Sequence, residues 1–92
     1  MKKRKAMKKR QSQKAHAIRR AHERYGLSVS VKDLRALCTV IQEGKSRFVG
    51  RASIRVAMHV VEYDGAPVCV AYDTTRQMIC SFLPLPLFEA AQ

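Results

Sequence analysis

The sequence predicts an α+β fold, in which two N-terminal helices pack on one face of an antiparallel meander sheet of three or four strands. Before residue 44 the apolar residues recur at intervals of three and four, which is typical of helices, and runs rich in β-branched residues follow. Between two of these runs stands Asp64-Gly65, the strongest two-residue signal for a β-hairpin. The 92 residues suffice for one domain. We divide them into a basic flexible arm, residues 1–14, and a single domain, residues 15–92.

Two helices are expected before the strands. The first spans residues 13–25 and ends at Gly26, and its apolar stripe comprises Ala17, Ile18, Ala21 and Tyr25. The second spans residues 31–43. Ser30 and Asp33 have the spacing of an N-terminal capping box, and Gly44 closes the helix. Its buried stripe comprises Leu34, Leu37, Cys38 and Ile41.

Four strands are expected after the helices, at residues 47–51, 54–63, 67–73 and 78–83. A two-residue turn at Asp64-Gly65 predicts the pairs Tyr63–Ala66, Val61–Val68, His59–Val70 and Ala57–Tyr72. A four-residue turn at 74–77 continues this register. It pairs Val70 with Ser81 and Tyr72 with Ile79, so that His59, Val70 and Ser81 form one row.

This register separates two sheet faces. One is entirely apolar, so we expect the helices to dock there; it holds Val56, Met58, Val60, Cys69 and Ala71. The other is mixed and is expected to stay open; it holds Arg55, Ala57, His59, Val61, Val70 and Tyr72.

The mixed face offers the groups that a metal-independent ribonuclease needs. A base must take the 2′-hydroxyl proton, an acid must protonate the leaving 5′-oxygen, and a cation must stabilise the phosphate. The candidate catalytic residues are His59, Tyr72 and Ser81, with Arg55 as a nucleic-acid-binding residue. The alternative is that an open sheet face is simply solvated and carries polar residues.

Nearly all of the net charge lies at the N-terminus. The first 24 residues hold eleven Lys or Arg and one acid, a net charge of +10, whereas the remainder sums to +1. Mutual repulsion predicts that residues 1–13 are disordered, or a fraying helix, when free in solution. The natural partner is a polyanion, RNA or DNA. The candidate nucleic-acid-binding residues of the arm are Lys2, Lys3, Arg4, Lys5, Lys8, Lys9, Arg10 and Lys14.

A second basic feature lies on the first helix, where His16, Arg20 and Arg24 are spaced four apart and form one ridge. Their mutual repulsion favours an anion beside them, and a phosphate backbone would serve. We take Arg20 and Arg24 as nucleic-acid-binding candidates and His16 as a catalytic candidate. The alternative is a solvated basic helix face.

The stretch from His16 to Leu27 resembles the opening of small RelE/BrnT-like proteins, in which a helix reads His-Ala-x-x-Arg-x-x-x-Arg before a Gly-Ile or Gly-Leu. Residues 70–73 are similar to the Val-x-Tyr-Asp strand of that family, and 79–84 to its closing strand, which usually has Thr at the place of Ser81. The resemblance implies a barnase/RelE-like fold and a toxin ribonuclease neutralised by an antitoxin. It implies functional roles for His16, Arg20, Arg24, Tyr72 and Ser81. The chain departs from the pattern at Tyr25 and in its long arm.

The remaining features narrow the function classes. Cys38, Cys69 and Cys80 have no metal-ligand spacing, so no metal or other cofactor is expected, and buried thiols suit a reducing cytoplasm. No run approaches the length of a membrane span, and membrane binding is not expected.

Two main functions stay open. The first is an RNA-binding, RelE/BrnT-like protein that acts on RNA or the ribosome as an endoribonuclease toxin. The second is a non-catalytic accessory protein, such as a phage or mobile-element inhibitor, that binds nucleic acid or a ribonucleoprotein. A third is a protein-interaction module, for which the apolar tail from Leu83 to Phe88 offers a dimerisation surface.

Overall fold

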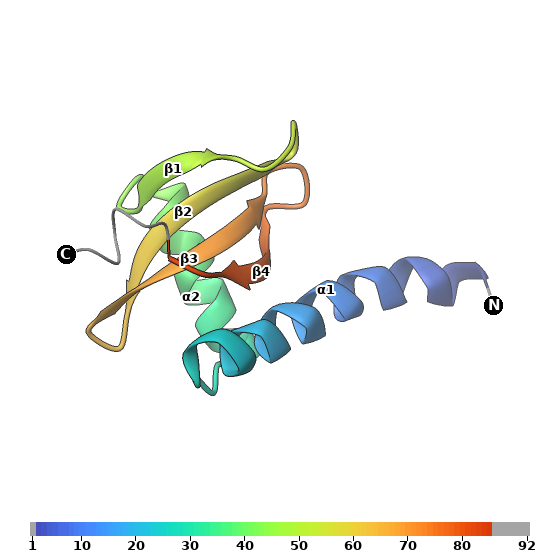
Figure 1. Ribbon diagram of the computed structural model, residues 1–92. Helices are drawn as coiled ribbons and strands as arrows, with labels where there is room; N and C mark the ends of the chain where they lie inside the picture. The colour runs from blue at the N-terminus through green and yellow to red at the C-terminus, as the bar shows by residue number, and fades with distance from the viewer. Residues whose placement is uncertain (1, 86–92) are drawn as a thin grey trace.

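The computed structural model describes residues 2–85, with side chains from residue 13 onward (Figure 1). The tail beyond Leu85, to which the dimerisation hypothesis refers, lies mostly outside the described residues. The elements are α1 (Lys2–Tyr25), α2 (Val31–Gln42), β1 (Arg47–Arg51), β2 (Val56–Tyr63), β3 (Ala66–Asp73) and β4 (Met78–Leu83). The strands form one antiparallel sheet in the order β1-β2-β3-β4. This arrangement confirms the predicted α+β meander.

The first helix is longer than predicted, since α1 continues through the expected boundary between arm and domain. Its C-terminal half packs against β4 through the fully buried Ala17 and Ala21. Its N-terminal half projects beyond the sheet (Figure 1). The helix ends at the predicted glycine, because Gly26 adopts a φ of +65° and the Leu27 N–H reaches the carbonyl of Ala21 at 3.2 Å. The Gly26 N–H also donates to the His22 carbonyl at 2.9 Å, which is the 5→1 bond of an αL C-cap.

The capping signals of α2 are confirmed. The Ser30 hydroxyl accepts a hydrogen bond from the Asp33 N–H at 3.1 Å, and the Asp33 carboxylate accepts one from the Ser30 N–H at 2.9 Å. The helix ends at Gln42, one residue before the predicted end, and Gly44 follows with a φ of +74°.

The hairpin prediction is also confirmed, because Asp64 and Gly65 both have positive φ, as a type I′ turn requires. All four predicted pairs of β2 and β3 are present, from Tyr63–Ala66 to Ala57–Tyr72.

The predicted docking face, however, is wrong. Both helices cover the mixed face, whose core residues are Val61, Val68, Val70, Tyr72, Ile79 and Phe82. The physical reason is that this face also carries the largest buried apolar side chains, which fill the space against Ala17, Ala21, Leu34 and Leu37. The apolar set of Val56, Met58 and Val60 lies on the opposite face.

The predicted pair of Val70 and Ser81 is wrong as well. A β-bulge between β3 and β4 places Ala71 opposite Ser81 and Val70 opposite Phe82, whereas Tyr72 still pairs with Ile79 as predicted. The extra residue at Cys80 exchanges the sheet faces to which the following side chains of β4 point. Phe82 therefore enters the helix-covered core, and Ser81 lies on the opposite face from Tyr72 and His59.

Candidate nucleic-acid interface

The basic ridge of α1 forms as predicted, and its members also bond within the protein. The Arg20 Nε lies 3.5 Å from His16 Nε2, and its Nη1 donates to the Glu23 carboxylate at 2.8 Å. Arg20 therefore joins an imidazole to a carboxylate along one partly exposed helix face. Glu23 offsets part of the ridge's positive charge.

The next turn fixes α1 to the sheet. Arg24 Nη1 donates to the Phe82 carbonyl at 3.0 Å. The Tyr25 hydroxyl donates to the Leu83 carbonyl and accepts from the Cys69 N–H at 3.1 Å, so it bridges β3 and β4. Burial raises the pKa of Tyr25, which keeps this hydroxyl protonated. Tyr25, the residue that departs from the RelE/BrnT-like pattern, thus docks the helix.

A second group of predicted residues lies beside the C-terminal end of α2. His59 Nδ1 is 2.8 Å from the Ser46 hydroxyl, and its ring meets Tyr72 edge-on at a centroid distance of 6.2 Å. Gln42 Nε2 donates to the Tyr72 hydroxyl at 3.0 Å. Burial lowers the pKa of His59, which favours the neutral imidazole at pH 7. Tyr72 is only 6% exposed. The prediction that this sheet face stays open is therefore wrong at Tyr72.

Arg55, by contrast, is exposed in the segment between β1 and β2. Its carbonyl accepts two hydrogen bonds from Thr74, from the N–H at 2.7 Å and from the hydroxyl at 2.8 Å. Asp73 is buried, which opposes its ionisation, yet hydrogen bonds from two backbone N–H groups and the charges of Arg55 and Arg76 lower its pKa. The Arg55 charge thus supports the turn between β3 and β4.

Of the four candidate catalytic residues, the structure brings two together, His59 and Tyr72. Among residues 13–85, no hydrogen bond or ring contact joins His16 or Ser81 to that pair. Ser81 donates instead to the Phe82 carbonyl at 3.4 Å. The four do not form one ribonuclease centre in this conformation.

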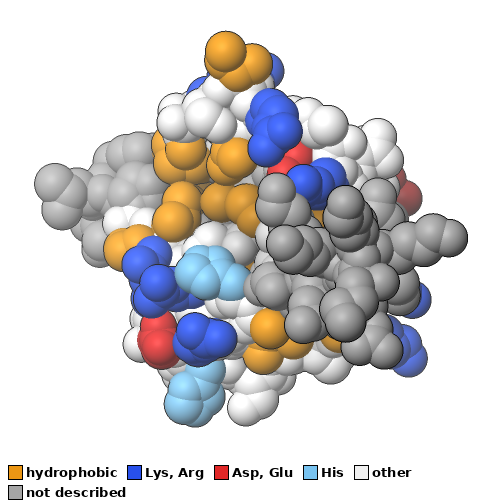
Figure 2. Space-filling view, turned by 90° about the vertical axis from the view of Figure 1, so that its right-hand side faces the viewer, with side chains coloured by type: hydrophobic (Ala, Val, Ile, Leu, Met, Phe, Trp, Pro, Cys, Tyr) orange, Lys and Arg blue, Asp and Glu red, His pale blue; other side chains and the backbone are white. Residues whose placement is uncertain are grey.

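The basic residues of the arm all belong to α1, which therefore carries the net charge of +10 on a single helix that projects from the body. Figure 2 views the molecule from that side, and among the side chains from residue 13 onward it shows Lys and Arg beside imidazoles on the surface. Within the described chain, no His, Cys, Asp or Glu residues group in the way that a metal ion requires. None of the helices described is both long and apolar enough to span a membrane.

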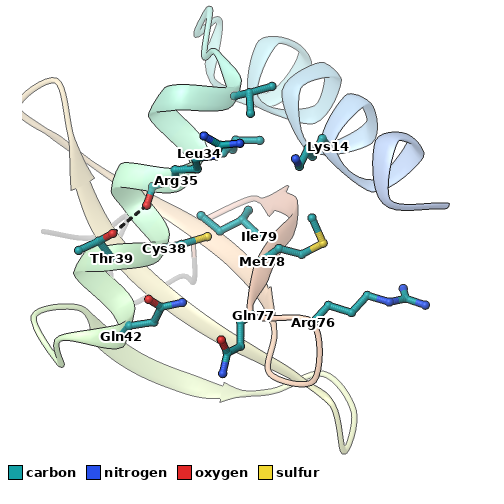
Figure 3. Close-up of a pocket in the computed structure, with 11 residues that line it drawn as sticks. Lys14, Leu34, Arg35, Cys38, Thr39, Gln42, Arg76, Gln77, Met78 and Ile79 are labelled. Atoms are coloured by element: carbon teal, nitrogen blue, oxygen red, sulfur yellow. Dashed lines mark hydrogen bonds between the residues drawn. The ribbon is translucent and has the colours of Figure 1, made fainter. Parts of the chain in front are cut away.

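A pocket of about 320 Å³ lies between α2, α1 and the turn that leads into β4 (Figure 3). Its polar lining includes Lys14, Arg35, Gln42, Arg76 and Gln77. Only Lys14 of these was predicted as a binding residue. In the sequence, Arg35 and Gln42 occupy the polar, solvent-facing positions of an amphipathic helix. No sequence signal indicated that the turn between β3 and β4 would approach them.

Comparison of the chain with protein-family models, with curated proteins and with solved structures finds no match. The resemblance to RelE/BrnT-like proteins therefore stays a prediction from the residues that carry it.

Proposed function

We propose that this protein binds RNA through α1, and that the sheet and α2 form the scaffold that presents this helix. The observation that carries the proposal is the separation of charge. One helix holds a net charge of +10, whereas the residues after Arg24 sum to +1. The choice of RNA over DNA follows the sequence resemblance, and DNA is the competing outcome of the test.

The geometry of α1 suits a phosphate backbone. Its 24 residues span about 36 Å at a helical rise of about 1.5 Å per residue. The basic residues are distributed along this length of the helix, so several of them can meet phosphates together. With about eight phosphates contacted, log K should fall against log salt with a slope of about −5 to −6 on single-stranded RNA.

A salt titration with matched variants tests the proposal. Fluorescence anisotropy of a labelled single-stranded RNA would be measured for the wild type, for an arm variant with Lys2, Lys3 and Lys5 changed to Gln, and for a body variant with Lys32, Lys45 and Arg51 changed to Gln. The arm variant should bind more weakly, and its salt slope should shrink by about 2, or about 0.7 per lost contact. The body variant should behave like the wild type.

Equal losses in the two variants would contradict the proposal, because they would assign the binding to total charge rather than to α1. Tighter binding to duplex DNA than to RNA, at equal salt, would replace RNA by DNA as the partner.

A metal-independent endoribonuclease is the second candidate, and the contact between His16 and Arg20 favours it. An imidazole 3.5 Å from a guanidinium, on the helix that would meet phosphates, places a base beside a phosphate-binding cation. His16 would take the 2′-hydroxyl proton, O2′ would bond to phosphorus, and the 5′-oxygen would leave and take a proton from water. Cleavage of RNA in EDTA that His16→Ala abolishes and His22→Ala preserves would support it. Absence of RNA cleavage by the wild type would contradict the endoribonuclease and leave RNA binding as the proposed function.

A further inference from the structure

The pocket between α1, α2 and the β3–β4 turn is built from three separate parts of the chain. Lys14 comes from α1, Arg35 from α2 and Arg76 from the turn. Figure 3 shows the Lys14 ammonium and the Arg35 guanidinium pointing toward each other across the opening, while Arg76 extends outward at the rim. The fold therefore gathers cations that are far apart in sequence.

Two of these cations, Lys14 and Arg35, have no acidic partner in the described part of the chain. Among the described residues, Lys14 and Arg35 form neither an ion pair nor a side-chain hydrogen bond. Arg76 lies 4.0 Å from the Asp73 carboxylate, at the limit of an ion pair, and no acidic residue is among the pocket's described lining. Two like charges that face each other across a hollow favour an anion between them.

The floor of the pocket is apolar. Leu34 and Ile79 are 4% and 1% exposed, and Cys38 and Met78 complete the surface between them. Burial raises the pKa of the Cys38 thiol, so it contributes a neutral, weakly polar surface. Such a floor suits the face of a flat ring.

Two amides border this floor, from Gln42 and Gln77. Gln42 uses one amide hydrogen to bond the Tyr72 hydroxyl at 3.0 Å, so its other hydrogen and its carbonyl oxygen are available to a ligand. An amide with both a donor and an acceptor matches the edge of a nucleobase.

We propose that this pocket binds one unstacked nucleotide of the bound RNA. The base lies on the apolar floor within reach of the Gln42 amide, and the phosphate lies between Lys14 and Arg35. The volume of about 320 Å³ is at the lower end of the range for small-molecule sites. The inference rests on the proposed RNA binding, since α1 supplies both Lys14 and the arm that holds the strand.

Mononucleotides test the pocket directly. Uridine 5′-monophosphate and adenosine 5′-monophosphate would each be titrated into the full chain, while backbone amide shifts are followed by NMR. We expect the shifts to map to residues 34–42 and 76–79, and to be weaker with uridine, adenosine or inorganic phosphate alone. Arg35→Gln should raise the Kd by about tenfold, as expected for the loss of a charge-assisted hydrogen bond. Lys32→Gln removes the same charge from α2 outside the pocket and should leave the Kd unchanged.

Labelled RNA then separates the two proposals. If Arg35→Gln weakens RNA binding and Lys32→Gln does not, the pocket holds a nucleotide of the strand. If mononucleotide shifts fall outside the pocket, or both variants act alike, the pocket assignment is wrong even where the arm variant still loses RNA. If mononucleotides occupy the pocket but RNA does not bind at any salt concentration, the occupant is a free nucleotide, and both the RNA assignment and the proposed function are wrong.

Discussion

The Tyr25 hydroxyl offers the sharpest test of how α1 is fixed to the sheet. Tyr25→Phe deletes a single oxygen and keeps the ring, which meets Phe82 edge-on at a centroid distance of 6.4 Å. The lost oxygen accepts from the Cys69 N–H at 3.1 Å and donates to the Leu83 carbonyl. The substitution therefore removes two hydrogen bonds that join β3, β4 and α1, with little change in packing.

The expected cost follows from these two bonds. Each contributes about 0.5–1.5 kcal/mol, so the free energy of unfolding should fall by about 1–3 kcal/mol. In a domain of this size the melting temperature falls by roughly 4–8 °C for each kcal/mol lost. Urea unfolding followed by circular dichroism measures the free energy, and a thermal scan provides an independent check.

Tyr63→Phe is the matched control, because it deletes the same oxygen from a tyrosine that donates to the Asp33 carboxylate at 3.1 Å near the surface. Water can replace that partner, so the loss should be clearly smaller than for Tyr25→Phe. If Tyr63→Phe costs as much, or if Tyr25→Phe leaves the free energy of unfolding unchanged, the hydroxyl bridge does not anchor α1.

Three further predictions concern pH and the β3–β4 turn. Because burial raises the pKa of Tyr25, its contribution to stability should be complete below its unfolded pKa of about 10 and lost as the pH rises beyond it; Tyr25→Phe should flatten urea-derived stability between pH 9 and 11. Because burial lowers the pKa of His59, the contribution of its neutral imidazole to stability is present above about pH 6.5 and lost on acidification. His59→Gln should therefore reduce the change in the free energy of unfolding between pH 7 and 5. An equal reduction by His22→Gln, at an exposed histidine, would contradict this prediction. Asp73 Oδ1 accepts hydrogen bonds from two backbone N–H groups of its turn, each at 3.0 Å. Asp73→Ala should therefore lower the free energy of unfolding, measured by thermal denaturation, by about 1–3 kcal/mol more than Asp73→Asn, which keeps that oxygen. Equal losses in the two variants would assign the effect to the charge of Asp73 instead.

Local signals predicted those features whose physical cause is local. The capping box of Ser30 and Asp33 places donor and acceptor within one helical turn, and the Asp64-Gly65 turn needs only two residues with positive φ. The pairing of β2 with β3 then follows from that turn alone. The candidate site was less predictable, because Arg35 and Arg76 belong to different elements that meet only in the folded chain.

Sequence alone therefore determined the α+β order, the start of α2, the β2–β3 register and the concentration of charge in the first 24 residues. Only the tertiary structure decided which sheet face receives the helices. Both faces of β2 and β3 carry apolar residues, so alternation cannot distinguish them, and the choice depends on how Phe82 and Ile79 fit against Ala17 and Ala21. The bulge at Cys80 made that fit possible by turning Phe82 into the core and Ser81 away from it. A register shift of this kind is set by packing between distant segments, which leaves no mark on the local pattern of residues.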